Sequence, residues 1–140
     1  MATETVTFVI IPALIMGGII GLIELFFVHA DEIGMGWFMH GLHALPATML
    51  FTFASMNMTW VHSLIPALAK NFWMDIGIRA AIAVFAMFKI QAAAAIAGRV
   101  GERIHHTVII GCLIFASPYI WMVLGPLLAP LLSSGAKAKR

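Results

Sequence analysis

The feature that most constrains this chain is the apolar run at residues 12–28, PALIMGGIIGLIELFFV, which contains one charged residue, Glu24. The run is too long and too apolar for an ordinary core helix of a soluble protein. A helix suits a bilayer because it satisfies its own backbone hydrogen bonds in hydrocarbon. Ala13, Gly17, Gly21 and Glu24 follow steps of four, four and three, so they share one helix face. The pattern predicts a membrane span whose small residues meet another helix and whose carboxylate is stabilised there.

Composition extends this prediction to the whole chain. Of its 140 residues, 62% are hydrophobic and only 10% are charged, and the mean hydropathy is +1.02. A soluble domain has about 25% charged residues, so this chain is too apolar to cover its surface in water. We predict an all-α polytopic integral membrane protein, with residues 1–140 forming a single transmembrane domain of about four helices in a bundle. The formal charge of +2, without a basic stripe, argues against nucleic acid as a partner.

The breaks between apolar runs place the spans. They are predicted at roughly 6–29, 41–60 (possibly to 69), 76–98 and 107–132, with a solvated tail at 133–140. Residues 61–75 are compatible with a helix, a loop or an interfacial segment. Asp75 and Arg79, four apart at the start of the third span, are in position to pair. Pro118 and Pro126 predict a bend in the last span.

Charges near the predicted span ends give an orientation. The side shared by both termini has more lysine and arginine, which favours cytoplasmic termini. The start MATETVTF has no Lys or Arg and carries Glu4, so we expect the first span to be retained and not cleaved as a signal peptide. Cys112 is the only cysteine, which excludes an intramolecular disulfide.

Histidines are the most informative polar residues in so apolar a chain. In the predicted topology five of the six fall near one membrane face, and only His62 lies toward the other. Neutral imidazoles and a carboxylate are ligands that zinc, copper and iron take in proteins. The sequence therefore offers a candidate metal site on the outer face. Its residues are His29, Asp31, His40, His43, His105 and His106.

Interface anchoring is the competing interpretation of these histidines, because an imidazole has an apolar body and a polar tip. His40 and His43 are three apart and share a helix face, but His105 and His106 are adjacent and do not point both rings at one site from a regular helix. Haem between His43 and His105 or His106 is disfavoured because no ligand motif is present. We expect either no cofactor or copper or another transition metal.

Two charged residues lie inside predicted spans. Glu24 in the first span and Lys89 in the third are at similar depths, so they are predicted to form a buried ion pair, with an ion or proton relay as the alternative. The pair would join two small-residue faces, one of which contains Gly17 and Gly21. The packing faces consist of Ala13, Gly17 and Gly21 in the first span and Ala86, Ala93 and Ala97 in the third.

A third polar feature lies in the second span. Thr48, Thr52, Ser55 and Thr59 follow steps of four, three and four, which places their hydroxyls on one helix face. Such hydroxyls bond across helices or to their own backbone carbonyls. Helix packing is the preferred interpretation of this face, and a transport path is the alternative.

Three functions remain open at this point. The first is a non-catalytic structural or accessory subunit of a larger membrane complex, such as a membrane oxidoreductase, with the lipid bilayer and other membrane subunits as partners. The second is a metal-binding membrane protein that uses the histidine cluster. The third is a small homo-oligomeric ion or proton transporter that uses Glu24 and Lys89. No catalytic motif is present, so we do not expect the chain to be an enzyme by itself.

Overall fold

The computed structural model describes residues 6–31, 36–68, 70–97 and 103–137, without the side chains of residues 43, 93–97 and 131–137. Within these ranges the chain is all-helical and contains no strand, as predicted. The helices are α1 (Ile10–Asp31), α2 (Trp37–Met56), α3 (Met58–Leu64), α4 (Phe72–Ala97) and α5 (Ile104–Lys137).

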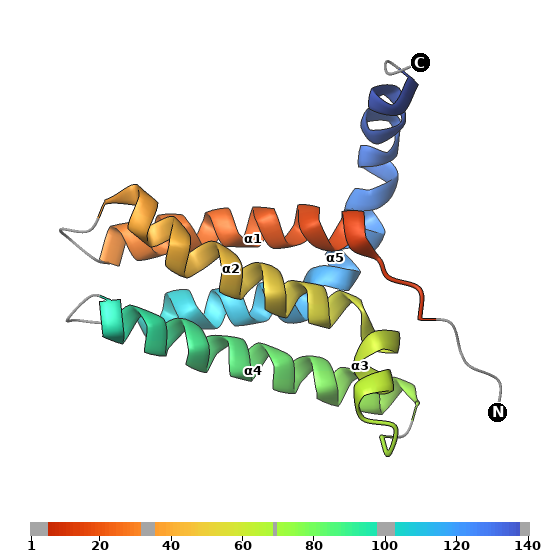
Figure 1. The fold of residues 1–140 in the computed structure, drawn as a ribbon, viewed down its shortest axis with the longest axis horizontal. Coiled ribbons are helices and arrows are strands. Elements are labelled where there is room, and N and C mark those ends of the chain that lie inside the picture. The colour runs from red at the N-terminus through yellow and green to blue at the C-terminus, as the bar shows by residue number, and fades with distance from the viewer. Residues whose placement is uncertain (1–5, 32–35, 69, 98–102, 138–140) are drawn as a thin grey trace.

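Four helical segments lie side by side, and those adjacent along the chain run in opposite directions (Figure 1). They are α1, α2, α4 and the first half of α5. The end of α1, the start of α2, the end of α4 and the start of α5 lie at one end of the bundle, which we call the histidine end. The short helix α3 and the start of α1 lie at the other, which we call the α3 end. Around the bundle the order is α1, α2, α4 and α5, so α1 and α4 are diagonal to each other.

The small-residue face of α1 packs against α2. Ala13, Gly17, Gly21 and Glu24 are all buried. A Cβ placed on Gly17 would lie 3.1 Å from the Cα of Met49, and one on Gly21 would lie only 2.7 Å from Leu45 Cδ2. The two glycines therefore allow a close backbone approach that larger residues would prevent.

The apolar core joins α1, α4 and α5. Its buried residues are Met16, Ile20, Ala86, Ile90, Ile110 and Ile114. Ala86 is buried in this core, whereas the side chains of Ala93 and Ala97 are outside the described part. Gly111 supplies a close contact that the sequence did not point to, because a Cβ there would lie 2.6 Å from Met87 Cγ.

The structure corrects the predicted limits of the second span. Its helix starts at Trp37 and stops at Met56, and residues 58–64 form the separate helix α3. The break is at Asn57, whose side-chain amide donates to the carbonyl of Phe53 at 2.8 Å while its Oδ1 accepts the backbone N–H of Val9 at 2.7 Å. These bonds hold the chain out of helical geometry, and they remove Thr59 from the predicted hydroxyl face.

The last helix bends away from the bundle (Figure 1). Up to Ser117 it supplies buried residues, but from Pro118 to Pro130 none of its side chains is buried. Prolines at 118, 126 and 130 each remove a backbone donor, which is the usual cause of such a bend. The helix continues to Lys137, so residues 133–137 of the segment predicted as a solvated tail are helical.

Two helices in the described part are long and apolar enough to cross a membrane by length and composition. They are α1 and residues 104–130 of α5. Both α2 and α4 carry more polar side chains, among them His40 in α2 and Asp75, Arg79 and Lys89 in α4. The helical prediction is therefore confirmed, and two candidate spans weakly support a membrane protein.

Candidate functional site

Two histidine rings from neighbouring helices meet at the histidine end. The Nδ1 atoms of His29 in α1 and His40 in α2 are 3.2 Å apart. The ring of His29 stacks on Trp37 with centroids 3.8 Å apart, and His40 is completely buried. When both rings are neutral, one Nδ1 donates its hydrogen to the other, so the two histidines take different tautomers.

A second polar contact at this end joins α1 to α5. Asp31 accepts hydrogen bonds on Oδ2 from the His106 ring at 2.7 Å and from the backbone N–H of Arg103 at 3.0 Å. The Arg103 Nε lies 3.3 Å from the other oxygen, Oδ1. His106 also stacks flat on Phe27, with centroids 4.2 Å apart. Asp31 therefore ties together two helices that are distant in sequence.

Among the described side chains, the predicted metal ligands contact one another in two groups. His29 contacts His40, and Asp31 contacts His106, whose ring centroid lies 4.2 Å from that of the exposed His105; the side chain of His43 is outside the described part. In the part of the chain that the structure describes, no group of three or more His, Cys, Asp or Glu side chains is arranged to hold a metal ion. The metal site stays a prediction to which the described residues add no third ligand.

The predicted ion pair between Glu24 and Lys89 does not form in this structure. Glu24 is 1% exposed, whereas Lys89 is exposed on α4. The physical reason is the order of the helices, because α1 and α4 are diagonal and each packs against α2 and α5 instead. The similar predicted membrane depths of Glu24 and Lys89 therefore did not mean that their helices are neighbours.

The hydroxyl face of α2 points into the bundle. Thr48, Thr52 and Ser55 are completely buried. Thr48 Oγ1 donates to the carbonyl of Ala44 at 2.8 Å, which is a common bond for a helical threonine. Thr52 Oγ1 and Ser55 Oγ, in contrast, have no hydrogen-bond partner among the described residues. Two buried hydroxyls without partners require an explanation, since most such groups in proteins are bonded.

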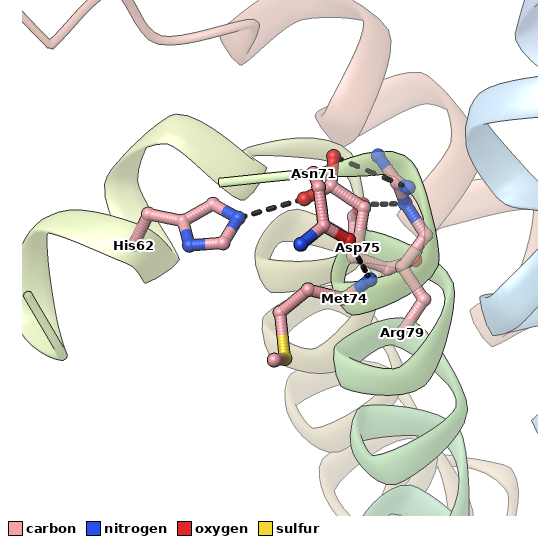
Figure 2. A network of polar contacts seen from close by, with 6 residues as sticks. His62, Asn71, Met74, Asp75 and Arg79 are labelled. Carbon is pink, nitrogen blue, oxygen red and sulfur yellow. Dashed lines mark hydrogen bonds and ion pairs between the residues drawn. The ribbon is translucent and has the colours of Figure 1, made fainter. Parts of the chain in front are cut away.

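The α3 end has its own polar network, which Figure 2 shows. His62 Nε2 and Asp75 Oδ1 are 2.7 Å apart, and Asp75 Oδ2 lies 3.9 Å from Arg79 Nη1. Arg79 Nε donates to the carbonyl of Ser55 at 3.1 Å, and its guanidinium lies 5.8 Å from the centroid of the Tyr119 ring. Arg79 therefore connects α4 to α2 and to the bend of α5.

Sequence reasoning found only part of this network. The four-residue spacing of Asp75 and Arg79 predicted their pairing, but nothing predicted the contact with His62. That contact depends on the break at Asn57, which turns α3 toward the start of α4. The only sequence signal for this arrangement was the polar residue Asn57 followed by a short apolar stretch. That pattern is compatible with either a helix or a loop.

Comparisons of the chain with protein-family models, with curated proteins and with solved structures gave no match. The arguments about function below therefore depend on the residues and their geometry alone.

Proposed function

We propose that the chain is a multi-pass membrane protein, with α1, α2, α4 and α5 crossing the bilayer, and that it acts as a non-catalytic structural or accessory subunit of a larger membrane complex. The observation that carries the proposal is the apolar second half of α5, which bends out of the bundle: Ile120, Trp121 and Leu124 pack against the core, while Met122, Val123 and Leu127 are exposed. We call residues 118–130 the α5 arm. The proposal assigns no reaction to the chain alone.

The outer surface of the bundle supports the membrane part of the proposal. Each long helix presents large apolar side chains outward, so the surface suits lipid chains far better than water. A bilayer accepts such a surface as long as the backbone is helical. Exposed examples are Leu14, Leu22 and Phe26 in α1, Leu42 and Leu50 in α2, Phe85 and Phe88 in α4, and Val108 and Ile109 in α5.

The α5 arm supports the subunit part. Its direction differs strongly from that of the four parallel and antiparallel segments (Figure 1). The candidate span of α5, residues 104–130, includes the arm, so the apolar length of this span continues beyond the four packed segments. The arm is apolar on all sides, and exposed side chains include Met122, Val123 and Leu127. A helix of that kind is normally enclosed by other protein or by lipid, so an adjacent subunit that covers it fits best.

Lysine and arginine near the membrane give the proposed orientation. In the sequence Lys70 follows α3, and Lys137, Lys139 and Arg140 follow the arm. The proposal assigns these basic residues to the membrane side shared by both termini, and the rule that cytoplasmic loops are rich in lysine and arginine makes that side cytoplasmic.

The test is purification from the native membrane in mild detergent, followed by mass spectrometry of the intact complex. We expect unlike subunits to accompany the wild-type chain. Met122→Asn, which places an amide on the arm, should release them. Phe88→Asn is the matched control, because Phe88 is equally exposed but lies on α4. A wild-type chain that purifies alone, or only with copies of itself, would contradict the subunit proposal.

Metal binding is a second candidate because of the two facing imidazoles. In a tetrahedral site with metal–nitrogen bonds of about 2.0–2.1 Å, two nitrogen ligands lie roughly 3.3–3.4 Å apart. The His29 and His40 Nδ1 atoms are 3.2 Å apart, close to that separation. Elemental analysis of the same complex measures copper, zinc and iron. Metal that is stoichiometric in the wild type and lost in a His29→Ala, His40→Ala double variant would favour this function, and its absence would remove it.

A further inference from the structure

The inward face of α2 is polar along most of its length. His40, Thr48, Thr52 and Ser55 are completely buried, and Ala44 occupies the only apolar place between them. From residue 40 to residue 55 these positions follow steps of four, four, four and three, so they form one continuous line along the helix. Burial of these polar side chains costs free energy unless each of them is hydrogen-bonded.

Glu24 of α1 lies in the interval between His40 and Thr48. The facing positions of the two antiparallel helices are 17 with 49, 21 with 45 and 29 with 40, which places residue 24 opposite residues 42–45. Glu24 is 1% exposed, so its carboxyl group lies within the bundle. Residue 24 is therefore level with the interval between His40 and Thr48, where Ala44 interrupts the polar line of α2.

We attribute the missing hydrogen-bond partners of the Thr52 and Ser55 hydroxyls to buried water. Thr48 and Ser117 both satisfy their hydroxyls by donating to carbonyls of their own helices. Thr52 and Ser55 do not, and no described residue bonds to their oxygens. Buried waters typically occupy such places, where each bridges groups that otherwise lack a partner.

Both ends of the row reach ionisable side chains that are partly exposed. At the histidine end His40 contacts His29, which is partly exposed. At the α3 end the Ser55 carbonyl binds Arg79, and Arg79 lies beside Asp75, which is partly exposed and bonded to His62.

We propose that this row is a hydrated proton path through the bundle, with Glu24 as the group that binds the proton in the apolar interior. The row consists of His40, Glu24, Thr48, Thr52 and Ser55. Glu24 accepts a proton from the His40 side and releases it to water on the Thr48 side. No electron moves and no other reactant is needed. The described titratable side chains toward the histidine end of the row are His40 and His29, which contact each other, and Asp31 and His106, which form a second contact.

This inference goes beyond the subunit proposal, because the row lies within one chain and needs no partner. The test uses the full chain reconstituted in liposomes that contain a pH-sensitive dye, with a potassium gradient and valinomycin to impose a membrane potential. We expect proton influx well above that of protein-free liposomes. Wild-type influx no faster than that of protein-free liposomes overturns the proposal, and the subunit experiment above is unaffected by that result.

Glu24→Gln tests the proton-binding group. We expect it to lower the influx at least about 100-fold, the lower end of what a positioned proton-transfer group contributes. Lys89→Gln is the matched control, because Lys89 is the exposed ionisable residue of α4 and lies outside the row. Its influx should stay within about twofold of the wild type, since it removes no group of the path. Unchanged influx in Glu24→Gln overturns the proposal.

Thr52→Val tests the hydrated part and covers the case in which Glu24→Gln does not fold. The change keeps the shape of the side chain and removes the hydroxyl, and we expect a loss of about tenfold, equivalent to one hydrogen bond. Thr59→Val is its control, because Thr59 is exposed beyond the break at Asn57. Circular dichroism confirms the helical content of each variant. Equal influx in the two threonine variants, or flux of sodium in place of protons, overturns the proposal.

Discussion

The two ends of the bundle contain the same three groups in opposite environments. At each end an aspartate lies 2.7 Å from a histidine nitrogen and within 4 Å of an arginine. At the histidine end the Asp31 side chain is 2% exposed and Arg103 is 70% exposed. At the α3 end the Asp75 side chain is 31% exposed and Arg79 is 15% exposed. The more buried charged group is the Asp31 carboxylate at the histidine end and the Arg79 guanidinium at the α3 end.

The difference in burial indicates which charged residue connects the helices at each end. An unpaired charge costs far more free energy when it is buried than when it is exposed. The stability of each end should therefore depend on the contacts of the buried charged residue and much less on those of the exposed one. Asp31 accepts bonds from a ring and from a backbone N–H of α5, and thereby joins α1 to α5. Arg79 makes the equivalent connections at the α3 end, to α2 and to the ring of Tyr119. Comparable substitutions at the two ends should therefore differ in their effect on stability.

The largest difference is expected between Asp31→Ala and Asp75→Ala. Removal of Asp31 takes the charged acceptor from the part-buried His106 ring and from the backbone N–H of Arg103, and the cost should be about 3 kcal/mol of unfolding free energy. Removal of Asp75 from a partly exposed place should cost about 1 kcal/mol. Equilibrium unfolding of both variants with a denaturing detergent, followed by circular dichroism, measures the difference. Equal losses would show that the depth of the carboxylate does not decide its contribution.

Much of this comparison was not accessible from the sequence. Apolar runs and their breaks predicted the helices, and the four-residue spacing of Ala13, Gly17 and Gly21 identified the face that packs on α2. Those are local signals, because each is set within one helix. The histidines were also expected at one end. Their division into two groups depends on which helices are neighbours, and that order follows from the packing of whole faces, which no single spacing encodes.

The incorrect predictions have the same physical origin. Glu24 and Lys89 were paired by depth, but the helix order separates them diagonally. The second span was drawn through Asn57 because its flanks are apolar, whereas the amide competes with the backbone and stops α2 there. The Asn57 side chain also accepts the distant backbone N–H of Val9. A contact of that kind produces no periodic pattern in the sequence.

A smaller effect is expected when the arginines are exchanged for lysine. Arg79→Lys keeps the charge but loses the Nε donor to the Ser55 carbonyl and the planar group beside Tyr119, so it should cost about 1.5 kcal/mol. The detergent unfolding assay measures this loss. A cost below about 0.5 kcal/mol, the usual range for surface substitutions, would mean that Arg79 acts only as a charge.

Arg103→Lys, the matched change at the histidine end, is expected to have the smallest effect. The Arg103 side chain is 70% exposed, and exposed ion pairs contribute at most about 1 kcal/mol. The hydrogen bond from the Arg103 backbone N–H to Asp31 does not involve the side chain, so the variant keeps it. We therefore expect a change below about 0.5 kcal/mol, the usual range for a surface substitution. The remaining contribution of the Arg103 side chain to stability should disappear as salt screens its charge, whereas that of the buried Asp31 carboxylate should persist. Unfolding at low and at high salt separates these two contributions. A loss in Arg103→Lys that does not depend on salt would show that this arginine holds α5 to α1 through contacts that salt does not screen.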